Sequence, residues 1–338
     1  MIVVMQQRAE EAATARVVRR IEAARLGAYV FHGEERNVIA VLPAAASAGP
    51  LDADEALRDE LQALPGVERV DWTTRPFKLA SREVRPAGTQ FALGEARVGA
   101  GVVVFAGSSR PRSAQELVAL GRAARAAGAQ AFWAGRGDGG ELRHDLVSAL
   151  DELRAEVGLP VVVDVWEPVE VDRLSRHADA LQVPGQQMQN FPLVKEAGQG
   201  DRPVFLCRGP SATVEEWLMV AERALKAGNM RLALCEQGIR TFEPSVRATL
   251  DFSAIAVAKR LSHLPILANP SLPADHWEIV PDLSLAAIAA GADGLLVDVH
   301  LGEADEASAG PQSLPIAELT TLIPRLVATR AALNRRTA

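Results

Sequence analysis

Eight strand-like segments alternate with helix-like segments from residue 100 to residue 334, and no other feature constrains the fold as much. The strand-like segments are rich in apolar, β-branched residues, and polar side chains stand at or near the C-terminal end of each. Buried parallel strands that open onto a site have this pattern. They cover residues 101–107, 130–135, 160–165, 180–184, 203–208, 231–236, 265–271 and 294–300. Eight strand–helix units predict a closed (β/α)₈ barrel, and a doubly wound open sheet is the alternative.

The first 73 residues predict a separate small domain. Its segments follow the order strand, helix, strand, strand, helix, strand, which is that of the ferredoxin-like split unit. Modules of this kind more often bind regulators or partners than carry out chemistry, so we expect a regulatory or oligomerising role by analogy of fold. Residues 74–99 then form a linker with a short hairpin, and residues 100–338 form the barrel.

Composition excludes several classes of partner. The net charge is −7 and the chain has no long basic run, which argues against nucleic acid as a partner. No apolar stretch reaches the ~18 residues of a membrane span, and the N-terminus lacks the charged and apolar regions of a signal peptide. The two cysteines, Cys207 and Cys235, do not suggest a disulfide framework, so we expect a cytoplasmic protein.

The active sites of such barrels lie at the C-terminal ends of the strands. The polar residues expected there form a sparse ring of Ser108, Ser109, Arg110, Arg136, Asp138, Asp164, Gln186, Gln187, Cys207, Arg208, Glu236, Arg240, Asn269, Ser271, Asp298 and His300. Arg208 and Arg240 follow neighbouring strands, so we predict that they bind a phosphate or carboxylate together; rim salt bridges are the alternative. Arg136 and Gln186 are further candidates for binding this anion.

The catalytic candidates in this ring are Cys207, Glu236 and His300, with Asp164 and Asp298 as further carboxylates. A cysteine and a histidine at strand ends are able to form a nucleophile–base pair. A small buried thiol and a structural histidine are the alternative interpretations. Residues 135–140 also fit the G-x-G-x-x-G pattern of a dinucleotide loop, but within an eightfold barrel pattern a shortened loop is favoured.

Several short motifs carry a resemblance to a known family. Residues 78–83 read Lys-Leu-Ala-Ser-Arg-Glu, residues 188–191 Met-Gln-Asn-Phe, residues 234–243 Leu-Cys-Glu-Gln-Gly-Ile-Arg-Thr-Phe-Glu, and residues 312–314 Gln-Ser-Leu. In these motifs the chain resembles the 3-deoxy-D-arabino-heptulosonate 7-phosphate (DAHP) synthases, in their short form with an N-terminal ferredoxin-like regulatory domain. The resemblance implies a barrel that joins phosphoenolpyruvate to erythrose 4-phosphate, the first step of aromatic amino-acid synthesis. It also implies a divalent metal held by Cys, His, Glu and Asp.

The chain departs from the family at all four metal-ligand positions. The resemblance places Ser109 where the family has Cys, Leu272 where it has His, Asp298 where it has Glu, and Ala309 where it has Asp. One carboxylate and a neutral hydroxyl do not make a usual transition-metal site, so we expect no metal and no other cofactor.

The substrate side departs from the family as well. Residues 135–140 replace a longer Lys-Pro-Arg-Thr loop, Cys207 replaces the Lys of a Lys-Arg-Gly motif, and Gln186 replaces the Arg of Ala-Arg-Asn. Each lost charge-assisted hydrogen bond to an anionic substrate costs about 1.5 to 3 kcal/mol.

These departures lead to a functional prediction. We expect a non-catalytic binding or regulatory homologue, or a barrel with new metal-independent chemistry on a small anionic metabolite. An active DAHP synthase is the alternative. As protein partners we expect further copies of the chain and another shikimate-pathway protein.

Overall fold

The computed structural model divides into two compact units, Met1–Gly88 and Thr89–Ala338. It describes residues 1–32, 36–43, 55–72, 75–111, 113–136, 144–302 and 309–334. Residues 75–88, predicted as part of a linker, belong to the first unit, where Lys78 Nζ lies 3.3 Å from the carbonyl oxygen of Val41. No helix of the described residues is both long enough and apolar enough to cross a membrane.

The first unit is a four-stranded antiparallel sheet with two helices. Its elements are β1 Ile2–Met5, α1 Glu11–Ala23, β2 Leu26–His32, β3 Asn37–Pro43, α2 Glu55–Gln62 and β4 Val67–Asp71. The strand order β2-β3-β1-β4 confirms the predicted ferredoxin-like unit. Each helix buries one apolar face, through Val17 and Ile21 on α1 and through Leu57 and Leu61 on α2, against the core that includes Val3 and Ile39.

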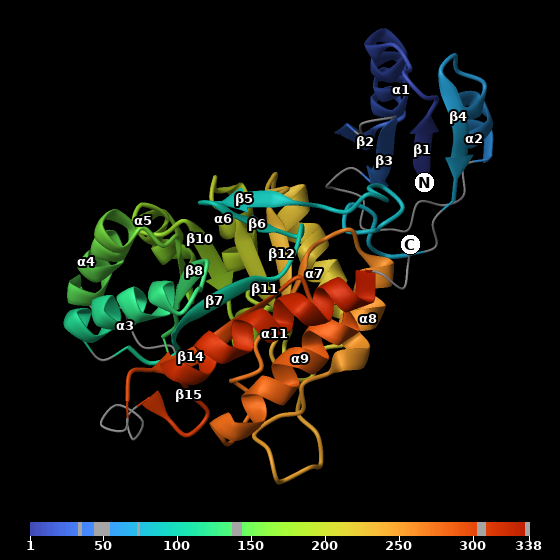
Figure 1. Cartoon of the computed structure of the whole chain (residues 1–338). Coiled ribbons are helices and arrows are strands. Elements are labelled where there is room, and N and C mark those ends of the chain that lie inside the picture. The colour runs from blue at the N-terminus through green and yellow to red at the C-terminus, as the bar shows by residue number, and fades with distance from the viewer. Residues whose placement is uncertain are drawn as a thin grey trace. The chain divides into compact units, whose positions relative to one another are not determined.

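The second unit is a closed barrel of eight parallel strands (Figure 1). The strands are β7 Val103–Ser108, β8 Ala131–Ala134, β9 Val161–Asp164, β10 Ala180–Val183, β11 Val204–Cys207, β12 Leu232–Glu236, β13 Ile266–Ala268 and β14 Gly294–His300. Each strand pairs with the next, and β14 pairs with both β13 and β7. The last pairing closes the sheet, so the barrel prediction is confirmed and the open-sheet alternative is wrong.

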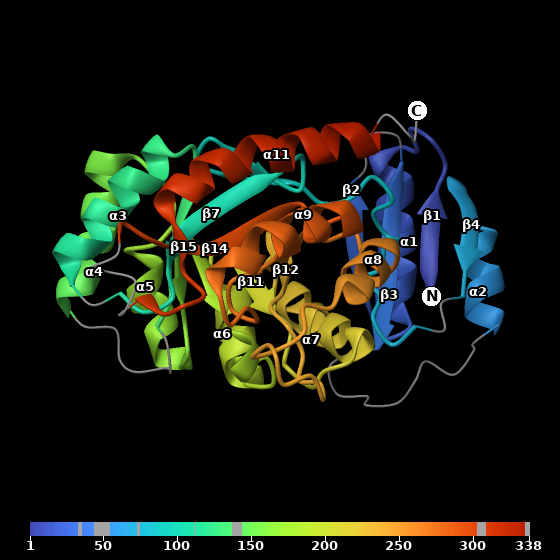
Figure 2. The same ribbon diagram turned by 60° about the horizontal axis from the view of Figure 1, so that its bottom comes forward.

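Helices cover the outside of the barrel. They are α3 Ala114–Ala126, α4 His144–Glu152, α5 Val171–Ser175, α6 Phe191–Gln199, α7 Val214–Lys226, α8 Phe252–Leu261, α9 Val280–Ala290 and α11 Ile316–Asn334. Figure 2 shows α11 lying along the outside of the barrel, beside α9. The sequence signals for helix starts are used as expected. Thr213 caps α7 by accepting a bond from the Glu216 amide, and the Glu216 carboxylate accepts one from the Thr213 amide.

Three short strands complete the unit: β5 Phe91–Leu93 and β6 Ala96–Val98 form a hairpin, and β15 Leu314–Pro315 pairs in parallel with the C-terminal end of β14. The interior of the barrel is filled by side chains from alternate positions of the strands. Phe105 and Phe205 meet edge to face with ring centroids 5.2 Å apart. Cys207 and Cys235 lie in the same cluster, in register on β11 and β12 and fully buried. The barrel is therefore a packed core and not a channel.

The close approach of β8 to β7 requires glycine at position 107. A Cβ atom at Gly107 would lie 1.7 Å from the carbonyl oxygen of Trp133 on β8, which leaves no room for a side chain. Gly107→Ala is therefore expected to lower the free energy of unfolding by about 3 kcal/mol or more in chemical denaturation. Gly101→Ala is the matched control, because nothing lies within 4 Å of its Cβ position. The control should change stability by less than about 1 kcal/mol, and equal effects of the two variants would contradict the close approach.

Candidate functional site

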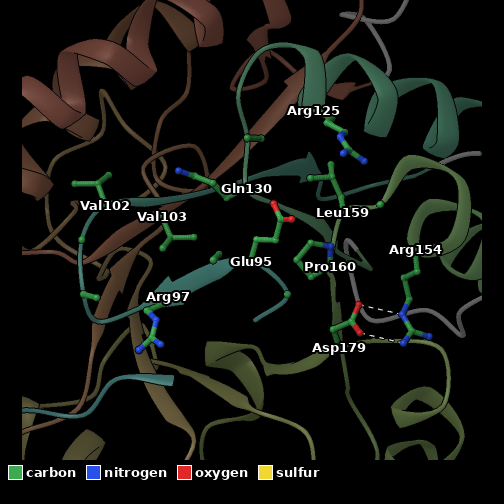
Figure 3. Close-up of a pocket in the computed structure, with 16 residues that line it drawn as sticks. Glu95, Arg97, Val102, Val103, Arg125, Gln130, Arg154, Leu159, Pro160 and Asp179 are labelled. Atoms are coloured by element: carbon green, nitrogen blue, oxygen red, sulfur yellow. Dashed lines mark hydrogen bonds and ion pairs between the residues drawn. The ribbon is translucent and has the colours of Figure 1, made fainter. Parts of the chain in front are cut away.

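The barrel has a cavity at each end. The larger one, about 820 Å³, lies at the N-terminal ends of β7 to β10, beside the β5–β6 hairpin (Figure 3). Most of its charged groups already have structural partners. Arg154 forms two 3.0 Å hydrogen bonds to the carboxylate of Asp179, and Arg125 donates to the carbonyl oxygen of Val157. Because barrel enzymes use the opposite end of the strands, this cavity is not the candidate active site.

The smaller cavity, about 350 Å³, lies at the C-terminal ends of the strands. Side chains from four successive strands and from β13 line it: Ser109 after β7, Trp133 on β8, Asp164 on β9, Gln182 on β10 and Asn269 after β13. The loop that follows β12 adds Gln237, Arg240 and Arg247. Its volume lies within the range for small-molecule sites, although at the lower end. Because it lies at the C-terminal ends of the strands, where barrel enzymes have their active sites, we take this cavity as the candidate active site.

Charge is distributed unevenly in the candidate active site. Arg110, Arg240 and Arg247 line it and are solvent-exposed residues, so they form a cationic rim. Neither Arg240 nor Arg247 forms an ion pair within the described part of the chain. Guanidinium groups with exposed forks attract and hold phosphates and carboxylates. The rim is therefore suited to the charged groups of an anionic ligand.

Asp164 is a buried carboxylate of the inner wall. Its Oδ1 accepts hydrogen bonds from Trp133 Nε1 at 3.0 Å and from Gln182 Nε2 at 2.9 Å. Burial raises the pKa of Asp164 to about 6, although these two hydrogen bonds and Arg136 oppose the shift. A carboxyl group with a pKa close to neutral is able both to give and to take a proton near physiological pH.

Arg208 does not reach the candidate active site. It is buried, its Nη1 lies 2.9 Å from Glu236 Oε2 and 2.9 Å from Asp251 Oδ2, and its Nε donates to the carbonyl oxygen of Ala212. The predicted joint anion site of Arg208 and Arg240 is therefore not assembled. The prediction fails because Arg208 is already paired with two carboxylates of the protein, one from β12 and one from the start of α8.

Of the two other residues predicted to bind the anion, one lines the candidate active site and one does not. Arg136 is turned into the protein, where its Nη1 lies 2.6 Å from Glu170 Oε2 and its side chain is 3% exposed. Gln186 does line the candidate active site. Asp138, with the rest of residues 137–143, lies outside the described residues, and the dinucleotide-loop interpretation falls on the same segment.

The predicted catalytic residues Cys207, Glu236 and His300 are not brought together. Cys207 is fully buried in the barrel core, and burial, together with Cys235, raises the pKa of its thiol well above the ordinary range. His300 ends β14, with β12 and β13 between it and Cys207, and its Nδ1 has no hydrogen-bond partner among the described residues. Glu236 is fully buried and is held by Arg208 and by the Gly238 amide. No hydrogen bond between described residues links the cysteine to the histidine.

Sequence reasoning missed several lining residues: Trp133, Trp166, Gln182, Gln237 and Arg247. One of them carried a usable signal. Gln182 is the single polar residue of the strand Ala-Leu-Gln-Val, and a buried polar side chain inside an apolar strand needs a partner. Trp133 gave no such signal, since a tryptophan in a buried strand is ordinary core composition.

Comparison with known proteins identifies the family. The sequence model of the DAHP synthetase I family matches residues 133–335, and that of the DAHP synthase ferredoxin-like domain matches residues 1–71. The phospho-2-dehydro-3-deoxyheptonate aldolase of Thermotoga maritima is 32% identical over 340 residues, which cover 96% of both chains. The chain belongs to the DAHP synthetase I family.

Solved structures of the family agree with the fold. A crystal structure of the Thermotoga maritima phospho-2-dehydro-3-deoxyheptonate aldolase (DAHP synthase) superposes with a TM-score of 0.73 and covers 98% of this chain and 97% of that one. A truncated form of the Thermotoga maritima synthase gives 0.72 at 34% identity, covering 76% of this chain and 97% of that one. The 2-dehydro-3-deoxyphosphooctonate aldolase of Acidithiobacillus ferrooxidans is 28% identical over 185 residues, 52% of this chain and 65% of that protein.

These matches correct the functional prediction made from the sequence. A non-catalytic homologue, or a barrel with new chemistry, was expected from the lost ligands. Identity of 32% along nearly the whole length of a DAHP synthase contradicts that expectation and favours the alternative, an active synthase.

The metal implied by the DAHP synthase family does not fit the residues that stand at its ligand positions. Asp298 accepts bonds from the Ser109 hydroxyl and, at 2.9 Å, from the Ser109 amide, while Gln312 Nε2 lies 3.3 Å from its Oδ2. Leu272 lines the candidate active site with an apolar side chain. Among the described residues, no three His, Cys, Asp or Glu side chains gather as a metal site would require. Hydrogen bonds within the protein thus occupy the carboxylate that would bind a metal.

The raised pKa of Asp164 predicts a pH-dependent effect of Asp164→Asn. The native pKa of about 6 lies above the unfolded value of about 3.9, so the folded protein binds more protons between these values and its stability falls as pH rises. Asparagine does not titrate. The free energy of unfolding of the variant minus that of the parent should therefore increase by about 2 kcal/mol from pH 4 to pH 7. Denaturant unfolding at both pH values checks this, and a constant difference would contradict the raised pKa.

The side chains at the four metal-ligand positions predict that the purified protein contains well below one Mn, Fe, Co or Zn ion per chain. Ser109, Leu272 and Ala309 replace three ligands, so that only Asp298 is left to bind a metal ion. Elemental analysis of protein prepared without chelator is the measurement. The triple variant Ser109→Cys, Leu272→His, Ala309→Asp is the positive control and should bind zinc. One metal ion per parent chain that disappears in Asp298→Ala would refute the prediction.

Proposed function

We propose that the chain is a DAHP-type synthase, which joins phosphoenolpyruvate to a phosphorylated aldose and gives a phosphorylated 3-deoxy-2-keto sugar acid. The observation that carries the proposal is the 32% identity to a phospho-2-dehydro-3-deoxyheptonate aldolase over 96% of both chains. That identity spans both the ferredoxin-like unit and the barrel. A cavity at the C-terminal ends of the barrel strands supports the same function.

The reaction makes one carbon–carbon bond and breaks one phosphate ester. The methylene carbon of the enol phosphate attacks the aldehyde carbon, and the aldehyde oxygen takes up a proton. Water adds to the carbon that bears the phosphate, and inorganic phosphate leaves as the 2-keto group forms. Both substrates are anionic, so their charged groups need cations, and one group must move protons.

Residues of the candidate active site meet these needs in part. Arg240 and Arg247 hold phosphate or carboxylate groups at the cationic rim, where no carboxylate of the described residues is paired with them. Asp164, with its pKa of about 6, is the group that gives or takes a proton at the inner wall. No step is assigned to a metal, since the donors present do not fit one.

The departures from the family bear on efficiency. Cys207 and Gln186 replace two cations that the family resemblance places on the substrate side. At about 1.5 to 3 kcal/mol for each charge-assisted hydrogen bond, the loss weakens binding of phosphoenolpyruvate by at least tenfold per cation. We therefore expect a high KM for this substrate.

The setting of the enzyme is also part of the proposal. Both cysteines are free and buried, which supports a reducing cytoplasm as the working compartment. The ferredoxin-like unit is proposed to regulate or to assemble copies of the chain, by analogy of fold.

An assay of product formation tests the function. Purified chain is supplied with phosphoenolpyruvate and either a four-carbon or a five-carbon aldose phosphate, since relatives are named for both product lengths. Phosphate release and the mass of the product are measured. We expect turnover of about 1 s⁻¹ or less with one of the two aldoses. Asp164→Asn and Arg240→Ala should each lower kcat/KM by about tenfold or more.

Arg97→Ala is the matched control for the arginine variant. Arg97 is exposed and lies beside the cavity at the opposite end of the barrel, so activity should be unchanged. If no product forms with either aldose at millimolar substrates, the proposed function is wrong.

A further inference from the structure

Two buried polar atoms in the candidate active site lack hydrogen-bond partners among the described residues. They are Gln182 Oε1 and Trp166 Nε1, and both side chains line the site. Gln182 is only 2% exposed. A buried polar atom left unpaired costs about 1 to 3 kcal/mol, so each of these atoms requires a partner that the described residues do not supply.

The chemistry of the two atoms is opposite and fixed. Gln182 Nε2 lies 2.9 Å from Asp164 Oδ1, and only the amide nitrogen can face a carboxylate, so Oε1 is the free acceptor. The indole nitrogen of Trp166 is a donor only. Both flank Asp164, because Gln182 is its register partner on β10 and Trp166 follows it by two residues.

A hydroxyl group satisfies both atoms and an ionic group does not. A hydroxyl is able to donate to Gln182 Oε1, and the same hydroxyl or a neighbouring one on the ligand is able to accept from Trp166 Nε1. Phosphate or carboxylate would accept from Trp166 but would face the lone pairs of Gln182 Oε1 and the carboxylate of Asp164. An ammonium group would leave Trp166 unpaired.

The remaining lining residues lead to the same conclusion. Beside Asp164, the inner wall carries neutral side chains, among them Trp133, Gln237 and Asn269. The arginines that line the site are exposed residues of its rim. A phosphate at the inner wall would lose its water without gaining a cation, which is costly. The cavity is thus neutral around Asp164 at its inner wall and cationic at its rim. A ligand that fits this arrangement has a neutral hydroxylated part inside and its charged group at the rim.

We infer that Gln182 and Trp166 form a hydroxyl-binding subsite, which takes the carbon chain of an aldose while its phosphate lies among the rim arginines. The identity of the ligand as an aldose phosphate rests on the proposed function. The preference for hydroxyls over anions rests on the two unpaired atoms and on the neutral side chains around them, and does not depend on the proposed function. Gln182 and Trp166 are therefore specificity-determining residues for the sugar, in the same cavity wall as Asp164, to which Gln182 is hydrogen-bonded.

Calorimetric titration of the full-length chain tests the subsite with ribose 5-phosphate and inorganic phosphate as probes. Trp166→Phe removes one donor and keeps an aromatic ring. It should weaken binding of ribose 5-phosphate by about five- to tenfold and leave binding of inorganic phosphate unchanged. Arg240→Gln should weaken both probes. Trp277→Phe, a half-buried tryptophan that does not line the site, is the matched control and should alter neither.

A second variant guards against misfolding of the first. Gln182→Met removes the acceptor at similar volume and should show the same selective loss for the sugar phosphate. Equal losses for both probes, or unchanged binding of ribose 5-phosphate in both variants, would overturn the subsite and assign the two atoms to ordered water.

The outcomes separate this inference from the proposed function. Selective loss in Trp166→Phe without any product from phosphoenolpyruvate would leave the subsite standing and refute the synthase. Product formation with an aldose KM that is unchanged in Trp166→Phe would support the synthase and refute the subsite.

Discussion

The pairing of β14 with β7 is the interaction on which the rest of the barrel depends. It joins the last strand to the first, from Gly294 opposite Val103 to Asp298 opposite Gly107. Glycines stand at both ends of this ladder because the neighbouring carbonyl oxygens leave no space for a Cβ atom. The same pairing sets Asp298 beside Ser109, and so completes the polar wall from which the site is built. Fold and site are therefore consequences of one closure.

The fold was predictable to a large extent because its signals are local. Apolar segments such as residues 180–184 are short and bounded by turn residues, and capping residues such as Thr213 mark helix starts.

The site was predictable only as a ring of positions. A strand end says that a side chain is near the mouth, but not whether another group already binds it. Arg208 illustrates the gap, since its partner Asp251 lies 43 residues away in sequence. Trp133 and Trp166 illustrate the reverse case, since large side chains that shape a cavity look like core residues in sequence.

The correction of the function has a related cause. The prediction of an inactive homologue depended on a few metal- and substrate-binding positions, whereas the comparison with the Thermotoga maritima protein depends on nearly the whole chain. Both observations concern the same barrel. The four metal-ligand positions determine which groups bind the Asp298 carboxylate at the barrel mouth. In this chain, Ser109 and Gln312 donate hydrogen bonds to it. The overall match describes the scaffold, the additional unit and the path of the chain. An enzyme that keeps the scaffold but handles charge differently satisfies both.

Two pairs of arginines near the mouth of the barrel differ in their electrostatic surroundings, and salt acts on them differently. Arg136 and Arg208 are shielded inside ion pairs, where mobile ions do not penetrate. Arg240 and Arg247 stand in water within reach of dissolved ions. At physiological ionic strength the screening length is about 8 Å, so the field of the rim extends little beyond the mouth of the cavity. Ionic strength thus weakens the attraction of the rim for anions while leaving the buried charge pairs almost unaffected.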